Sequence, residues 1–314
     1  SQTISILAIL RKNLLEHKNT QIIYTGNSLD FLDYKSLKHN YGYNFSLKKV
    51  KKLSDITPFE GSTILVSDFE KLEINDLNLD IDFFINIYKK LGSILIVNGN
   101  KNEHYISDIQ HVRRRETIAM TPISCYTALQ ALISNSNFSI STPNLEVNKK
   151  IVLDEIITIS GAKTDPIVGS SGLSIQYAIM MGLVDFAQEN YYGKSIKFIV
   201  PPNCYGGTND QARRVAECIN NVEVIDLLVD GENDMSHSID LILDEIAIQN
   251  DVPFIIAEIP TNPRVEVPDL NQLKAILEKK RKTNHGDNAI RLFVQILLFL
   301  TRLMFFQILV QFHM

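Results

Sequence analysis

Four consecutive residues, Gly169-Ser-Ser-Gly172, have the types and spacing to bind an anion. They stand just before residues 176–188, where apolar side chains recur at helical spacing. A Gly/Ser turn at a helix start presents backbone N–H groups without helical partners and the positive end of the helix dipole, and both favour phosphate. A serine N-cap beside a flexible glycine would explain the same residues without a ligand. For the turn alone, both interpretations stay open.

Two later loops carry further polar and aromatic groups. The loop Asn203-Cys-Tyr-Gly-Gly-Thr208 places the ring of Tyr205 before a double-glycine turn, and such a ring can stack on a flat heteroaromatic ligand. The loop Glu258-Ile-Pro-Thr-Asn-Pro263 holds the amide of Asn262 between two prolines, where it can donate to a phenolate or phosphate oxygen. Taken singly, the tyrosine could serve packing and the asparagine could be a turn former.

The elements around these loops predict that they meet at one edge of a sheet. Apolar runs predict strands at residues 195–200, 222–228 and 254–257, and helical spacing predicts helices at 208–219, 239–248 and 269–279. Thr208 and Gln211 resemble a capping box at the first of these helices. Residues 151–153 and 156–159 are apolar and β-prone. Alternating β and α elements indicate a mostly parallel sheet, and ligands of such sheets bind beyond the carboxyl ends of the strands.

Together and in this order, the three motifs resemble those of the Cys/Met-metabolism family of pyridoxal-phosphate enzymes, which includes cystathionine synthases and lyases. The family's Ser-Gly-Met, Tyr-Gly-Gly-Thr and Glu-Thr-Pro-Thr-Asn-Pro stand here as Ser171-Gly-Leu173, Tyr205-Gly-Gly-Thr208 and Glu258-Ile-Pro-Thr-Asn-Pro263. The second motif matches completely, and the third differs at Ile259. The resemblance covers residues 150–280, under half of the chain.

The resemblance implies an aspartate-aminotransferase-like large domain, the type I fold of these enzymes, and pyridoxal 5'-phosphate as the cofactor. Ser171, Gly172 and Leu173 would hold its phosphate, Tyr205 would stack on its pyridine ring, and Asn262 would bond its phenolic oxygen. The cofactor would be the electron sink for a lyase or transferase of trans-sulfuration that acts on a small amino-acid substrate. A cytoplasmic homo-oligomer is implied for the full-length family member.

Three family features are missing from this sequence. We find no Asp-Asn-Thr strand after Asn262, whose Asp would pair with the pyridinium nitrogen, and no Ser-x-Thr-Lys motif with the Schiff-base lysine. The family's Tyr-x-Arg ahead of the phosphate turn is also absent. The catalytic residues are therefore unknown, and we expect an incomplete and inactive portion of such an enzyme. A non-catalytic protein that keeps the binding fold is the alternative.

The first part of the chain predicts a smaller α/β unit, to which we assign no role. Strands are predicted at residues 21–24, 63–66 and 93–97, and helices at 5–15, 82–91 and 125–133. A Ser/Asn-rich loop at 134–144 indicates a domain boundary, which gives an N-terminal unit 1–145 and a partial cofactor-binding domain 146–288. The basic run at 111–115 could bind an anion, or be solvated and paired with acids such as Glu116.

The tail at 289–314 departs from the composition of the rest, since it is mostly Leu, Phe, Ile, Val and Gln. It begins where the family's Asp-bearing strand should start. A membrane helix, a buried core helix and an out-of-frame translation each explain this composition. The membrane helix would make the chain a membrane-tethered α/β protein, although Arg302 would be costly at the membrane midplane.

The composition and motifs of the 314 residues disfavour several classes of function. The net charge of −5 gives no global sign of a nucleic-acid partner. No dinucleotide fingerprint is present, which disfavours a nicotinamide oxidoreductase. The three cysteines, Cys125, Cys204 and Cys218, have neither metal-site nor disulfide spacing, so we expect reduced thiols, no metal and a cytoplasmic location.

Overall fold

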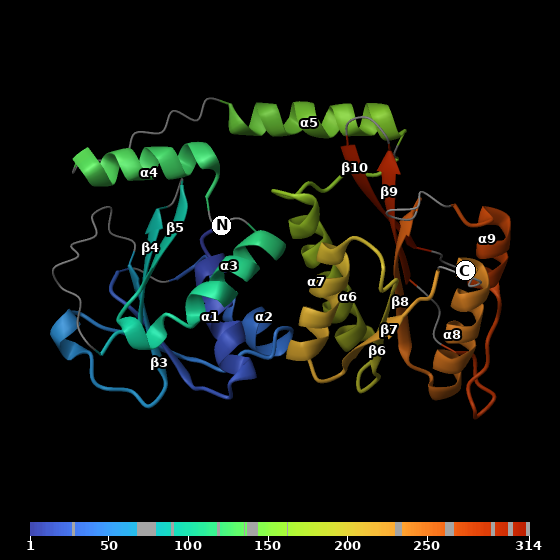
Figure 1. The fold of residues 1–314 in the computed structure, drawn as a ribbon, viewed down its shortest axis with the longest axis horizontal. Coiled ribbons are helices and arrows are strands. Elements are labelled where there is room, and N and C mark those ends of the chain that lie inside the picture. The colour runs from blue at the N-terminus through green and yellow to red at the C-terminus, as the bar shows by residue number, and fades with distance from the viewer. Residues whose placement is uncertain are drawn as a thin grey trace. The chain divides into compact units, whose positions relative to one another are not determined.

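The computed structural model describes the chain except residues 27–28, 68–79, 89–90, 118–119, 135, 137–143, 162, 230–233, 261–266, 290–292, 301–303 and 312–314, and it describes only the backbone of 293–300 and 304–311. It divides into two compact units (Figure 1). The first comprises Ser1–Lys38 and Tyr43–Ile175, and the second comprises His39–Gly42 and Gln176–Met314. The boundary expected near residue 145 stays a prediction.

The first unit is built on a five-stranded sheet in the order β2-β1-β3-β4-β5. The strands β1, β2, β3 and β4 are parallel, and β5 runs antiparallel to β4. Helices α1 and α3 pack together through Ile4, Ala8 and Val112. The elements are α1 (Ile4–Leu15), β1 (Thr20–Tyr24), α2 (Tyr34–His39), β2 (Ser46–Lys49), β3 (Ser62–Ser67), β4 (Phe83–Tyr88), β5 (Gly92–Val97), α3 (Tyr105–Arg115), α4 (Pro122–Ser134) and α5 (Leu145–Ser160).

Two predictions for this unit are wrong. Residues 82–91, predicted as a helix, contain strand β4, in which all six residues are buried. A short apolar run fits both a buried strand and a buried helix, so its periodicity could not separate them. The β-prone residues 151–159 lie in helix α5, which has no buried residue. There Lys150 and Asp154 stand four residues apart, a spacing that supports a helix.

The acid expected beside the basic run, Glu116, forms an ion pair with helix α1. Glu116 follows α3 directly and forms a buried ion pair with Arg11 of α1. Within the run, the Nε groups of Arg113 and Arg114 donate to the side chain and the carbonyl of Gln110. The pair of Arg11 and Glu116 therefore joins α1 to the end of α3.

The second unit is built on a sheet in the order β10-β9-β8-β6-β7, in which only β10 is antiparallel to its neighbour. The α/β class and the mostly parallel sheet are thus confirmed. The strands predicted at 195–200, 222–228 and 254–257 are confirmed. The elements are α6 (Gly172–Asn190), β6 (Ile196–Val200), α7 (Gly206–Cys218), β7 (Val222–Asp226), α8 (Met235–Gln249), β8 (Val252–Ile259), α9 (Leu270–Glu278), β9 (Phe293–Leu300) and β10 (Met304–Gln311).

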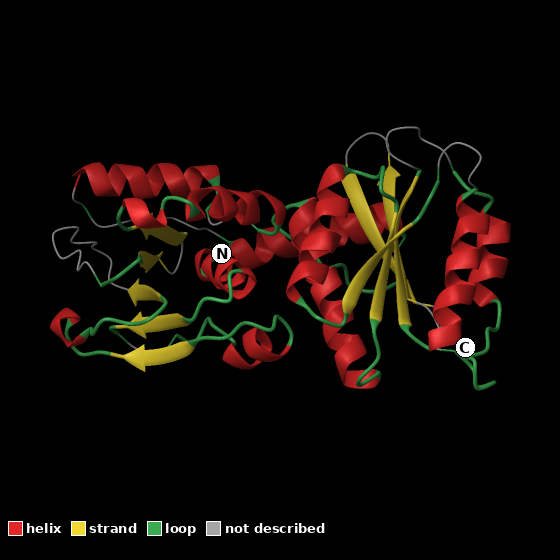
Figure 2. Ribbon diagram, turned by 60° about the horizontal axis from the view of Figure 1, so that its bottom comes forward, coloured by secondary structure: helices red, strands yellow, loops and turns green. Residues whose placement is uncertain are grey.

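Helices cover both faces of this second sheet (Figures 1 and 2). Alternate residues of a strand point to opposite faces, and β8 follows this rule closely. Phe254 and Ile256 pack with α6 and α7, whereas Ile255 and Ala257 pack with α8 and α9. Because β8 is buried on both sides, it reads in sequence as an almost continuous apolar run.

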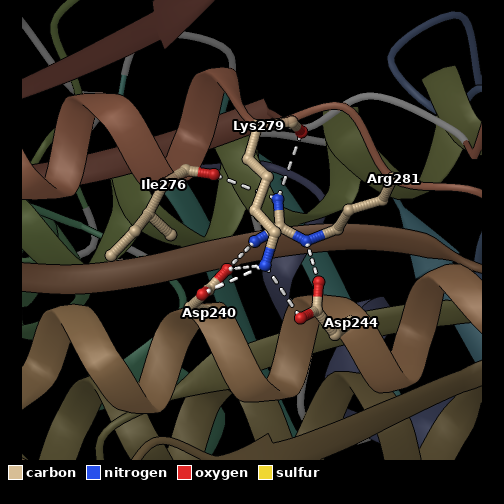
Figure 3. A network of polar contacts seen from close by, with 5 residues as sticks. All are labelled: Asp240, Asp244, Ile276, Lys279 and Arg281. Atoms are coloured by element: carbon tan, nitrogen blue, oxygen red, sulfur yellow. Dashed lines mark hydrogen bonds and ion pairs between the residues drawn. The ribbon is translucent and has the colours of Figure 1, made fainter.

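A network of charges ties the end of α9 to α8 (Figure 3). The guanidinium of Arg281 donates from Nε to Asp244 at 2.7 Å, from Nη1 to the carbonyl of Ile276 at 3.0 Å, and from Nη2 to Asp240. The Lys279 ammonium contacts both aspartates at 2.9 Å. A cavity of about 40 Å³ lies beside this network, with room for a few waters but not for a vitamin-sized ligand.

The described tail consists of two strands, so both helical interpretations are wrong for these residues. Strand β9 runs parallel to β8 with Phe293 opposite Phe254, and β10 returns antiparallel. In the described ranges, no helix is both long and apolar enough to cross a membrane. The out-of-frame interpretation stays a prediction.

Candidate functional site

Three segments meet at the carboxyl edge of the second sheet. The loop 201–205 follows β6, and Glu258 lies near the carboxyl end of the neighbouring strand β8. Helix α6 contributes Gln176 from its second turn. The contacts among them lie within the second unit. Two of the sequence motifs, Tyr205–Thr208 and the segment that begins at Glu258, are therefore neighbours in space.

Glu258 is the centre of these contacts. This residue is 2% exposed, and its two carboxylate oxygens accept the backbone N–H of Tyr205 at 3.2 and 3.3 Å. Tyr205 is the N-cap residue of α7, and its side chain makes no capping hydrogen bond. The carboxylate of Glu258 thus accepts an N–H group at the start of α7 that has no acceptor within the helix. The helix dipole favours a negative charge at this end.

Thr208 links Glu258 to helix α6. Its hydroxyl lies 3.3 Å from Oε1 of Glu258 and 3.4 Å from Oε1 of Gln176, so its single proton serves two acceptors. The capping box predicted for Thr208 and Gln211 is wrong, because α7 begins at Gly206 and Thr208 already lies in its first turn. Thr208 and Gln176 are both buried.

Burial sets the protonation of this cluster. Burial raises the pKa of Glu258, and the hydrogen bonds from Tyr205 and Thr208 only partly offset that effect. The neighbouring thiol of Cys204 is affected similarly: burial first, and the negative charge of Glu258 second, raise its pKa to about 12. Cys204 is therefore a protonated thiol at neutral pH and a poor nucleophile.

The ring of Tyr205 remains available to a ligand. Its residue is 47% exposed although its backbone is held by Glu258. The backbone there has φ −50° and ψ 122°, and it turns directly into α7. A fixed backbone beneath an exposed ring suits a stacking role.

The Gly/Ser turn starts a helix, as predicted. The hydroxyl of Ser171 accepts the N–H of Ser174 at 3.1 Å, and the hydroxyl of Ser174 accepts the N–H of Ser171 at 2.9 Å. The capping interpretation is thus confirmed for Ser171 and Ser174. A Cβ at Gly172 would meet no atom within 4 Å, whereas at Gly169 it would lie 2.8 Å from Oγ of Ser174.

The structure places the predicted site residues in different parts of the molecule. Tyr205 lies in the cluster with Glu258 and Thr208. Ser171, Gly172 and Leu173 belong to the first unit, at the start of the helix that contributes Gln176 to the second. Asn262 lies outside the described residues.

Sequence reasoning assigned no role to Glu258 or Gln176, although both are central to the contacts. The signal for Glu258 was present, since it is the one charged residue in the apolar strand β8. A buried carboxylate needs hydrogen-bond donors, and here one comes from the N-cap residue of α7 and one from the first turn of that helix. Gln176 gave no comparable signal, because a glutamine early in a helix is ordinary.

A second polar group occupies the same edge. Arg213 of α7 contacts Asp226, at the end of β7, at 2.5 Å and donates to Asn209 at 2.8 Å. Both members of this ion pair are 49% exposed. Among the described residues, no three His, Cys, Asp or Glu side chains gather to hold a metal ion.

The described residues fit part of a pyridoxal-phosphate site. Open space at Gly172 suits a phosphate, and the exposed ring of Tyr205 suits the pyridine face. The sequence of strand β9, beside β8, offers no carboxylate for the pyridine nitrogen, and Glu258 is engaged by Tyr205 and Thr208. Comparisons with family models, curated proteins and solved structures find no match to this chain.

Proposed function

We propose that this chain carries the cofactor-binding part of a pyridoxal-phosphate-dependent lyase or transferase of sulfur amino-acid metabolism, with a type I fold. The observation that supports this most is the contact of Glu258 with Tyr205 and Thr208. It joins two of the three sequence motifs at the sheet edge where α/β proteins bind ligands. The parallel pairing of β6 and β8 brings the two loops to this edge, and the hydrogen bonds add a direct contact between the two motifs.

Each residue of the proposed site has one task. The turn at Ser171, with the N–H groups of Gly172 and Leu173, binds the phosphate at a helix start. Tyr205 stacks on the ring, and Asn262 donates to its phenolic oxygen. The cofactor, when bound, supplies the electron sink for carbanion chemistry.

The proposal includes no catalytic step, because no lysine of this sequence is identified as the one that forms the Schiff base. The late lysines Lys274, Lys279, Lys280 and Lys282 match no Schiff-base motif. Lys279 is also held by two aspartates of α8. We therefore propose binding without turnover for this chain. The amino-acid substrate, the cytoplasmic location and the homo-oligomer of a full-length enzyme remain parts of the proposal.

A non-catalytic binding or regulatory protein is the second candidate. The observation that favours it is the composition of β9, Phe-Val-Gln-Ile-Leu-Leu-Phe-Leu, which runs parallel to β8 without any carboxylate. The encoding DNA separates the two candidates. An Asp-bearing strand motif and a lysine motif in another downstream frame would support the enzyme, and their absence from every frame would support the binding protein.

Equilibrium dialysis tests the binding that both candidates share. We expect saturable binding of pyridoxal 5'-phosphate and much weaker binding of pyridoxal, which lacks the phosphate. Borohydride treatment followed by peptide mapping should find no single lysine that is modified preferentially. Equal binding of the two compounds, or no saturable binding, would contradict the proposal.

A further inference from the structure

We infer that Glu258 is a positioning residue, which fixes the ring-stacking Tyr205 by capping helix α7 from strand β8. The inference rests on the proposed function for the role of Tyr205, but the contact itself stands on the geometry. Both carboxylate oxygens lie within 3.3 Å of the Tyr205 nitrogen. The neighbouring positions on β8, Ala257 and Ile259, pack into the core below.

Helix α7 begins at a residue that does not cap it with its own side chain. Helices usually begin with Ser, Thr, Asp or Asn, whose side chains accept an N–H of the first turn. Here a tyrosine holds that position, and its side chain makes no such bond. The N–H of the N-cap residue itself also lacks an acceptor within the helix, and in a capping box the third residue of the helix supplies one. Here Glu258 of β8 supplies that acceptor, so it holds the backbone of Tyr205 directly.

Burial explains why a carboxylate can hold this position firmly. Glu258 is 2% exposed, so water does not compete strongly for its oxygens. Its second contact, with the Thr208 hydroxyl, fixes the carboxylate plane, and Thr208 is itself held near Gln176 of α6. The chain Gln176–Thr208–Glu258–Tyr205 therefore connects α6, α7 and β8 at a single point. The ring of Tyr205 lies at the exposed end of this chain.

Amide hydrogen exchange tests the contact without any cofactor. In the full chain, the Tyr205 N–H should exchange slowly. In Glu258→Ala the exchange rate of this N–H should rise at least about tenfold more than the rate of global opening does. The matched control is Glu245→Ala, which removes an exposed glutamate of α8. Unchanged exchange at Tyr205 in Glu258→Ala would overturn the inference. Should Glu258→Ala not fold, Glu258→Gln carries the same test, with an intermediate acceleration expected.

A double-mutant cycle tests whether Glu258 acts through the tyrosine ring. In dialysis, Tyr205→Ala and Glu258→Ala should each weaken pyridoxal-phosphate binding by about tenfold. The double variant should also lose only about tenfold in affinity relative to the wild type, because both changes remove the same interaction. Glu258→Gln should retain most of the affinity. Additive losses, near a hundredfold, would overturn the positioning role. Unaltered binding in Tyr205→Ala would instead overturn the proposed function and leave the exchange result to decide the contact.

Discussion

The Glu258 carboxylate accepts the backbone N–H of Tyr205 with both of its oxygens, at 3.2 and 3.3 Å. Glu258 is the last residue but one of a buried strand, Tyr205 is the N-cap residue of a helix, and 53 positions separate them in the chain. The contact gives a buried charge a hydrogen-bond donor and gives a helix start an acceptor.

Replacing Glu258 by glutamine should alter the pH dependence of stability. Burial raises the pKa of Glu258 above its ordinary value of 4.5, so the folded state binds the proton more readily than the unfolded state. Stability is therefore lost as the pH rises from 4.5 through the raised pKa. The glutamine of Glu258→Gln does not titrate. The free energy of unfolding of this variant should therefore rise relative to that of the wild type as the pH increases through this window. Urea unfolding at a series of pH values measures the difference. A difference that does not vary with pH would contradict this assignment.

Thr208 should stabilise the cluster through its hydroxyl. Thr208→Val keeps the shape of the side chain but leaves the buried oxygens of Glu258 and Gln176 without this donor, and it should lower the free energy of unfolding by about 2 kcal/mol. Thr208→Ser keeps the hydroxyl and should lose under about 1 kcal/mol, the contribution of one buried methyl. Denaturant unfolding of both variants provides the comparison. Equal losses would mean that the hydroxyl contributes nothing.

The two glycines of the turn proposed to bind the phosphate should respond differently to alanine. Gly172→Ala places a methyl in open space at a helix start and should leave stability unchanged or raise it by about 0.5 kcal/mol. The same methyl would occupy the space of the phosphate and weaken cofactor binding by about tenfold. Gly169→Ala would press on Ser174 and lower the free energy of unfolding by about 1 kcal/mol. Thermal unfolding and dialysis separate these effects. Undiminished cofactor binding in Gly172→Ala would exclude this turn as the phosphate site.

Arg281 should be a main support of the packing between α8 and the end of α9. Its guanidinium reaches two aspartates and a carbonyl at once, a pattern that a lysine cannot reproduce. Arg281→Lys should lower the free energy of unfolding by about 2 kcal/mol. The exposed neighbour Lys280 provides the control, since Lys280→Ala should change stability little. Similar losses in both variants would show that the network in Figure 3 adds no specific stability.

Much of the second unit could be predicted because its local sequence patterns agree with the order of its strands and helices. The apolar runs that became β6, β7 and β8 are flanked by turn residues and alternate with amphipathic helices. The failures have physical causes. In β4, six consecutive buried residues carry no period, and the pairing with β3 and β5 decides the strand. In the tail, an apolar composition predicts burial but not whether the backbone bonds lie within one helix or between strands.

The site could be predicted only in part. Motif types indicated Tyr205 and the phosphate turn, since both lie at recognisable turn residues. The role of Glu258 depends on a contact across 53 positions, which no local pattern contains. Thr208 shows the limit most clearly: its spacing to Gln211 matched a local capping box, whereas its hydroxyl bonds to residues of β8 and α6.

The central claim is the proposal that pyridoxal 5'-phosphate stacks on the ring of Tyr205 and accepts a hydrogen bond from Asn262. Titration of the cofactor into isotope-labelled full chain, followed by amide resonances, tests it most directly. We predict that the resonances of these two residues shift together and yield a single dissociation constant. Cofactor binding that leaves the Tyr205 resonance unshifted, or different dissociation constants for the two residues, would contradict the claim.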